Sequence, residues 1–155
     1  MANFYSELAA QIFSNEFESN TGVISHSRIS GWLSANIGGL NTLLHTNFSG
    51  DNPEVDNAAA YIFSLMYLKD YNTRAARNAL RGVVTASTNG DNILSVSDGD
   101  NKISFVNKND VAKNFKGAAN DYSAEIKGLV YNYQMYAASP LQLCGYESSI
   151  SGNYY

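Results

Sequence analysis

The chain has few of the residues that mark covalent stabilisation, secretion or membrane insertion. Its 155 residues include a single cysteine, Cys144, so an intrachain disulfide is impossible and a secreted disulfide scaffold is excluded. No lysine or arginine precedes Arg28, so the amino-terminal segment lacks the basic region of a signal peptide. No apolar run approaches the roughly 18 residues that a membrane span needs. We therefore expect a soluble protein made in a cytoplasm, with no membrane partner.

Charge is also scarce. Only 15% of the residues are charged, the formal net charge is −4 at pH 7, and no block of like charges occurs. Nucleic-acid tails and membrane-binding patches usually contain such blocks. Nonspecific binding to DNA is therefore not expected.

Motifs for catalysis or cofactor binding are missing. His26 and His45 belong to no short metal-binding pattern, and Cys144 has no neighbouring histidine or lysine to activate its thiol. No Gly-x-Ser-x-Gly motif and no glycine-rich phosphate loop occurs. We therefore predict no catalytic residue and no cofactor, and the protein is not expected to be an enzyme.

One repeat could suggest a metal site. Gly90-Asp91-Asn92 is followed by Gly99-Asp100-Asn101, and carboxylates near glycine can bind calcium. The alternating acidic ligands of a calcium loop are incomplete, however, because Lys102 occupies the place of one. We interpret the repeat as two β-turns and assign no metal ligand, and a small metal-binding enzyme stays an alternative.

Hydrophobic periodicity predicts helices in the first part of the chain. The first helix has apolar residues at helical spacing, namely Phe4, Leu8, Ile12 and Phe13. A second helix, capped by Ser25 or Ser27, has an apolar side made of Ile29, Trp32, Leu33, Ile37, Leu40, Leu43 and Leu44. Gly38-Gly39 predicts that this helix kinks there or packs closely against another backbone. A third helix is expected to open at Pro53 and to continue, bent near residues 69–72, to about Arg81.

After Val83 the hydrophobic period changes from that of a helix to that of a strand. Asp98-Gly99 lies between two alternating segments and is a strong turn signal, which predicts a β-hairpin near residues 93–106. Asn89-Gly90 could form a second turn and add residues 83–87 as a third strand.

A last, long helix is predicted from about residue 109. Its apolar stripe consists of Val111, Phe115, Ala118, Tyr122, Ile126, Leu129, Tyr133 and Tyr136. Together these elements predict a mainly α protein, a bundle of about four helices with an inserted hairpin, over residues 1–138.

Residues 139–155 follow Ser139-Pro140 and match no helix or strand pattern. Apolar and aromatic residues are spaced among Ser and Gly, which suits an extended peptide that places alternate side chains in a groove. We predict a docking tail whose partner-binding residues are Leu141, Leu143, Tyr146, Ile150, Tyr154 and Tyr155.

Arg74, Arg77 and Arg81 lie at helical spacing on one face, whereas the first 27 residues contain three glutamates and no basic residue. Two interpretations stay open. The arginines could form a solvated surface with local partners such as Asp70. Alternatively, they could contact a neighbouring subunit, because different faces of identical chains meet in a ring. The candidate interface residues are Arg74, Arg77, Arg81, Glu7, Glu16 and Glu18.

Three segments carry a family resemblance: Asp70-Tyr-Asn-Thr-Arg-Ala-Ala-Arg-Asn-Ala-Leu-Arg-Gly82, Ser97-Asp-Gly-Asp-Asn-Lys-Ile103 and Val106-Asn-Lys-Asn-Asp-Val-Ala-Lys113. With the predicted order of helices, hairpin, long helix and tail, residues 4–138 resemble the head-to-tail connector proteins (adaptor or neck proteins) of tailed bacteriophages.

The resemblance implies a structural virion protein that forms a homo-oligomeric ring under the portal. Its expected partners are copies of itself, the portal protein, which the C-terminal tail would contact, and another neck or tail protein. Genomic DNA would pass through the ring without specific binding. Another neck or tail-completion component of the virion is the alternative.

Overall fold

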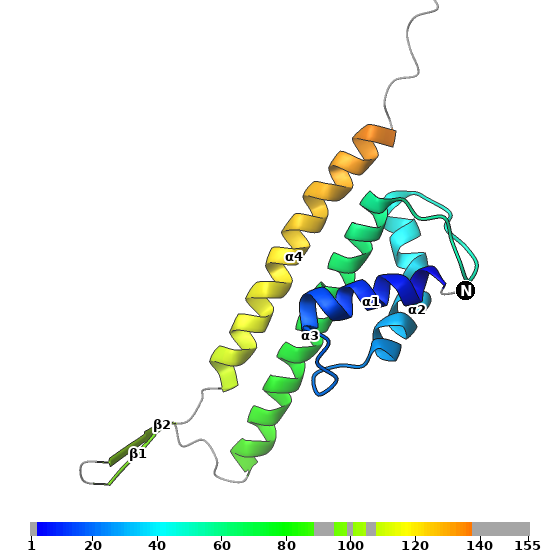
Figure 1. The fold of residues 1–155 in the computed structure, drawn as a ribbon. Helices are drawn as coiled ribbons and strands as arrows, with labels where there is room; N and C mark the ends of the chain where they lie inside the picture. The colour runs from blue at the N-terminus through cyan, green and yellow to red at the C-terminus, as the bar shows by residue number, and fades with distance from the viewer. Residues whose placement is uncertain (1–2, 89–94, 99–100, 105–107, 138–155) are drawn as a thin grey trace, which may run out of the picture.

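The structure is a computed structural model that describes residues 3–88, 95–98, 101–104 and 108–137. As predicted, the protein is mainly helical. The described part contains the helices α1 (Phe4–Phe17), α2 (His26–Leu44), α3 (Asn57–Thr88) and α4 (Lys108–Ala137). Figure 1 shows α3 and α4 as a long pair, with α1 and α2 beside the first half of α3.

Two short strands, β1 (Ser95–Asp98) and β2 (Asn101–Ser104), lie between α3 and α4 in the sequence. They pair in antiparallel register with Val96 opposite Ile103. The predicted hairpin bounds, 93–106, extend into residues that the structure does not describe. The predicted third strand at residues 83–87 is wrong, because α3 continues to Thr88. Each residue added to an existing helix gains a backbone hydrogen bond without a new nucleation cost, which favours this continuation.

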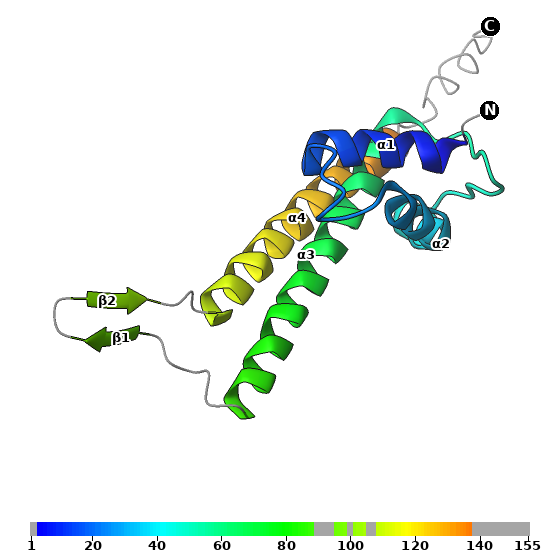
Figure 2. The same ribbon diagram turned by 60° about the horizontal axis from the view of Figure 1, so that its bottom comes forward.

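The core lies where α1 and α2 cover the first half of α3. Its largest fully buried side chains are Tyr67, Phe63, Ile29, Leu33, Leu40 and Ile62. Among the described side chains of α3, burial is concentrated between Ala59 and Leu68, and beyond Leu68 only Ala76 is buried. The second half of α3 therefore packs mainly on α4, and Figure 2 shows this pair extending past α1 and α2.

Side-chain caps set the ends of several helices. The Asn3 side chain accepts a hydrogen bond from the Ser6 N–H at 2.9 Å at the start of α1. Ser25 is the N-cap residue of α2, as predicted, but its side chain makes no capping hydrogen bond. The start of α3 was predicted too early: the Asp56 carboxylate accepts from the Ala59 N–H at 2.8 Å, so the helix begins at Asn57 and not at Pro53.

Of the two effects predicted for the glycine pair of α2, the close approach of another backbone is wrong. The helix runs through Gly38 and Gly39 without interruption. A β-carbon built on Gly39 would meet only the methyl group of the Met66 side chain, at 3.6 Å, and one built on Gly38 would meet nothing within 4 Å. No described backbone therefore needs the space that these glycines leave.

The prediction of which residues form the apolar stripe of α4 is only partly correct. Ile126 belongs to the core, but the buried positions in the first half of the helix are Ala112 and Ala119, one residue later than predicted. Tyr136 is 87% exposed although it was assigned to the stripe. Tyr136 lies in the last turn of α4, and Figure 1 shows that this end of the helix extends past the start of α3.

Candidate functional site

A groove of about 530 Å³ gathers the three predicted arginines. We call it the basic groove, and it is lined by Val23, Ile24, Arg28, Tyr67, Tyr71, Arg74, Ala75, Arg77, Asn78 and Arg81. The row of arginines on α3 faces the start of α2, which contributes Arg28. Neither Asp nor Glu is among these described lining residues. The site is therefore cationic and is built from two helices.

Local pairing accounts for part of this charge. The Arg74 Nε lies 2.9 Å from the Asp70 Oδ2 one helical turn earlier, and both side chains are well exposed. This is the pair that the first interpretation of the arginines predicted. Exposed pairs of this kind contribute at most about 1 kcal/mol to stability. The pair positions Arg74 without removing the positive charge contributed by Arg28 and Arg77.

Tyr67 forms part of the lining and is fully buried. Its ring packs edge-on against Trp32 and Phe17, with centroid distances of 5.3 and 6.4 Å. The hydroxyl oxygen is enclosed, and no hydrogen-bond partner for it exists among the described residues. An unsatisfied enclosed hydroxyl costs about 1–3 kcal/mol, so it calls for a functional or structural explanation.

Charged groups of both signs influence this hydroxyl. Burial raises the pKa of Tyr67 to about 12; the positive charges of Arg74 and Arg28 partly oppose that rise, whereas Tyr71 and the Asp70 carboxylate add to it. The hydroxyl is therefore protonated at neutral pH and is a hydrogen-bond donor without an acceptor. Sequence reasoning missed both Tyr67 and Arg28, because only the packing of α2 on α3 brings them to the arginine row.

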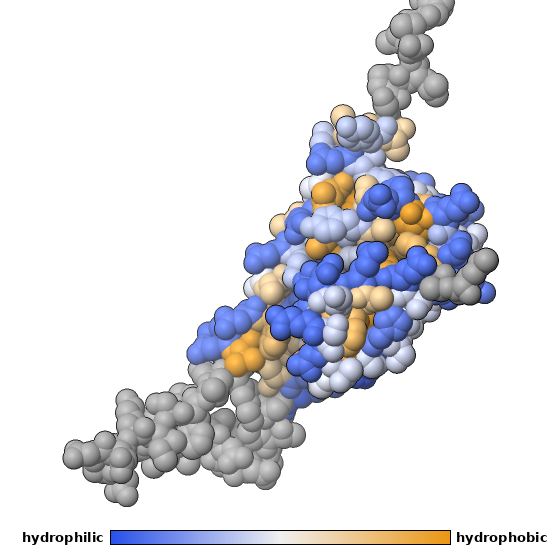
Figure 3. Space-filling model, in the orientation of Figure 1, coloured by the Kyte–Doolittle hydropathy of each residue, from blue (hydrophilic) through white to orange (hydrophobic). Residues whose placement is uncertain are grey.

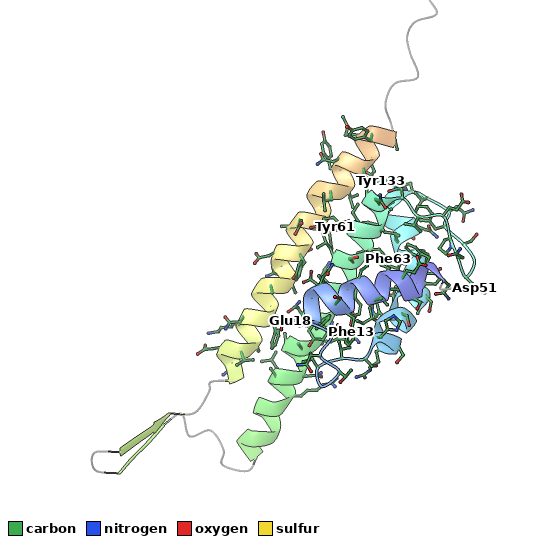
Figure 4. The ribbon with its side chains drawn as sticks, in the orientation of Figure 1. Phe13, Glu18, Asp51, Tyr61, Phe63 and Tyr133 are labelled. Carbon is green, nitrogen blue, oxygen red and sulfur yellow. The ribbon has the colours of Figure 1, made fainter. Side chains whose placement is uncertain are left out.

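A second groove, of about 410 Å³, lies between α1, α3 and α4. Its two carboxylates are Glu16 on α1 and Glu125 on α4, and neither Lys nor Arg is among its described lining residues. We call it the acidic groove. The Tyr61 hydroxyl donates a hydrogen bond to the Glu125 Oε1 at 3.0 Å, and this bond is the main cause that raises the pKa of Tyr61. Figure 4 shows Tyr61 on the side of α3 that faces α4.

The three predicted glutamates do not form one patch. Glu7 and Glu16 are both exposed on α1, but a separation of nine positions at about 100° per residue places them on opposite sides of the helix. Glu18 caps the helix end in the left-handed conformation, with φ 48°. Of the three, only Glu16 lines the acidic groove. The second carboxylate of that groove belongs to Glu125, which the sequence did not indicate as a site residue. In Figure 3, hydrophilic residues run along α1 on this face, beside smaller apolar areas.

The C-terminal end of α4 carries exposed aromatic and apolar side chains. Tyr131, Met135 and Tyr136 are between 57% and 87% exposed, and we call them the α4 end patch. Two hydrogen bonds fix this end of the helix: the Tyr133 hydroxyl donates to the Asp56 Oδ2 at 2.7 Å, and the Gln134 Nε2 donates to the Leu43 carbonyl at 3.2 Å. The predicted tail anchors, Leu141, Leu143, Tyr146, Ile150, Tyr154 and Tyr155, lie outside the described residues.

The histidines have structural surroundings. The His26 Nε2 lies 2.9 Å from the Ser6 carbonyl, which ties α2 to α1, and His45 caps the end of α2. Among the described residues, no group of three or more His, Cys, Asp and Glu side chains could hold a metal ion. Residues 90–92 and 99–100 of the two Gly-Asp-Asn turns lie outside that part of the chain. None of the described helices is long and apolar enough to cross a membrane.

Comparison with protein-family models, with curated proteins and with solved structures finds no match to this chain. The two grooves, the α4 end patch and the sequence resemblance are therefore the features that bear on function.

Proposed function

We propose that this chain is a structural protein that assembles with copies of itself, as a subunit of the ring that joins the portal to the tail in a tailed-phage virion. One observation carries the proposal: a single helical body presents a basic groove and an acidic groove at different places. A contact between unlike surfaces of identical chains produces a ring when the rotation closes. Because the two grooves carry opposite charges, each contact between the basic groove of one chain and the acidic groove of the next would be attractive.

The fold also supports a connector over the alternative, another neck or tail-completion component. For a stopper-type tail-completion protein, the expected body is a β-barrel, whereas this body is mainly helical. In the proposed assembly, the α4 end patch and residues 139–155 contact the portal protein, and another part of the ring contacts a further neck or tail protein. DNA passes through without specific binding, and the site of action is the virion.

The test is a charge reversal followed by restoration. Arg77→Glu places a negative charge in the basic groove and should reduce oligomer formation, because complementary charges align and steer partners. Glu16→Lys in the acidic groove should partly restore assembly when combined with it. Mass photometry and sedimentation velocity would measure the oligomers over a range of protein concentrations.

Lys127→Glu is the matched control, because Lys127 is exposed on α4 and lines neither groove. It makes the same change in net charge and should assemble like the wild type. High salt should weaken the wild-type contact, since the screening length falls to about 3 Å at 1 M ionic strength. A wild-type protein that stays monomeric at every concentration, or an Arg77→Glu variant that assembles normally, would contradict the proposal.

A further inference from the structure

The basic groove contains several hydrogen-bond donors, and the one described carboxylate beside it, that of Asp70, pairs with Arg74 and makes no hydrogen bond with Tyr67. Arg28, Arg74 and Arg77 supply guanidinium groups from two helices, and Tyr67 supplies a fully buried hydroxyl without a partner among the described residues. Most enclosed polar groups in folded proteins have a partner. A donor left without one beside several cations indicates that a negatively charged acceptor is the missing component.

The chemistry of that acceptor follows from the donors. A guanidinium group binds carboxylate and phosphate oxygens through parallel N–H donors. The Tyr67 hydroxyl adds one O–H donor, and it remains protonated at neutral pH because burial raises its pKa to about 12. Arg74 is already held by Asp70 at 2.9 Å, so Arg28 and Arg77 are the better candidates for neutralising a ligand.

We propose that the basic groove is a binding site for an oxyanionic group, with an oxygen that accepts a hydrogen bond from Tyr67 while Arg28 and Arg77 neutralise its charge. Because the hydroxyl is enclosed, binding includes a movement of side chains in the groove lining that opens access to it. Free phosphate and a carboxylate of a second copy share this chemistry. The site itself does not depend on ring formation.

The first measurement uses inorganic phosphate as the probe and the full chain as the protein. Phosphate should raise the melting temperature, and above its Kd the rise should follow the logarithm of the phosphate concentration, since a ligand at free concentration L that binds only the folded state stabilises it by RT ln(1 + L/Kd). Sodium chloride at equal ionic strength should not. The Nε–H signals of the groove arginines should shift in NMR spectra over the same concentration range.

Two variants test the named donors. Tyr67→Phe and Arg28→Ala should each weaken phosphate binding by about ten- to hundredfold, the range that corresponds to one hydrogen bond to a charged group. Tyr61→Phe is the matched control for loss of a phenol, because the Tyr61 hydroxyl already donates to Glu125 in the other groove. Its phosphate affinity should equal that of the wild type.

A competition experiment identifies the source of the oxyanion. If phosphate dissociates oligomers of the wild type, the natural ligand is a carboxylate of a second copy; if phosphate binds and leaves the oligomers intact, the ligand is a phosphate group. Either result supports the site.

Two outcomes would overturn the inference. In the first, phosphate changes the melting temperature no more than chloride does, and Tyr67→Phe and Arg28→Ala assemble normally. In the second, Tyr67→Phe binds phosphate as tightly as the wild type. If the wild type binds phosphate as expected but Arg77→Glu assembles normally, only the ring contact is refuted.

Discussion

Replacing Tyr67 by phenylalanine removes one enclosed oxygen and leaves the ring contacts in place. The aromatic neighbours Trp32, Phe17 and Tyr71 lie at centroid distances of 5.3, 6.4 and 6.5 Å. In the wild type, the unpartnered hydroxyl costs free energy on folding. At neutral pH and without phosphate, we therefore expect Tyr67→Phe to be at least as stable as the wild type, with a gain of up to about 1–3 kcal/mol in the free energy of unfolding.

The difference should grow in alkali. The pKa of Tyr67 is about 12 in the folded protein, against an ordinary value of 10.0. Above about pH 10, the unfolded chain loses this proton while the folded chain keeps it, so the folded state loses stability relative to the unfolded state. For a single group with these values, the loss is about 1.4 kcal/mol at about pH 11 and approaches about 2.7 kcal/mol above both pKa values. Tyr67→Phe lacks this contribution.

Guanidinium unfolding followed by circular dichroism, at steps between about pH 8 and pH 11, would measure both effects. Comparison with the wild type at each pH cancels the titration of the other tyrosines. Tyr61→Phe should lose a little stability at neutral pH, because it breaks the hydrogen bond to Glu125. A Tyr67→Phe variant that is clearly less stable than the wild type at neutral pH, or a difference that stays constant with pH, would refute the assignment of an unpaired enclosed hydroxyl.

Three further predictions concern packing, the loop after α2 and the tail. Ile126→Ala should lower the free energy of unfolding by about 2–5 kcal/mol, because this side chain is buried in the core. Lys127→Ala, on the exposed side, should lower it by less than about 0.5 kcal/mol. Equal losses in denaturant unfolding would mean that the buried face of α4 is wrongly assigned. Asn41→Ala should lower the free energy of unfolding by about 1–3 kcal/mol, since the Asn41 side chain accepts from the N–H of Phe48 and donates to its carbonyl, both at 2.8 Å. Asn41→Asp should lose only the bond to the carbonyl, and similar melting temperatures of all three proteins would contradict this. Deleting residues 141–155 should leave helical content and melting temperature nearly unchanged while abolishing incorporation into particles, and normal incorporation would refute the docking role.

Periodicity was sufficient to predict the helices but not all of their limits. Apolar spacing predicted the helix around Ile62 and the one around Ile126, because side-chain burial on one face determines that spacing. The start of α3 depends instead on which side chain accepts hydrogen bonds from the backbone N–H groups of the first helical turn. Asp56 did so, and Pro53, which favours a first helical turn, did not. Residues 83–87 contain β-branched side chains that favour a strand, yet they continue an existing helix.

The site could be predicted only where its residues share one helix. Arg74, Arg77 and Arg81 follow each other at helical spacing, and the structure places all three on one groove. Arg28 and Tyr67 join them only through the packing of α2 on α3, which no local pattern reports. The same applies to Glu16 and Glu125, which are far apart in the sequence and line one groove only through the packing of α1, α3 and α4.

Both grooves use α3, which would hold the two contact surfaces of the proposed ring in a fixed relation. Tyr61 lines the acidic groove and Arg77 lines the basic groove, and sixteen residues of one helix separate them by about 24 Å along its axis. The well-buried stretch of α3 from Ile62 to Leu68 contributes Leu65 to the acidic groove and Tyr67 to the basic groove, so the relative position of the grooves is fixed by a packed helix and not by a loop. A ring closes only if each contact repeats the same rotation. A rigid link between two complementary surfaces provides that repetition, whereas a flexible link would allow chains of variable curvature.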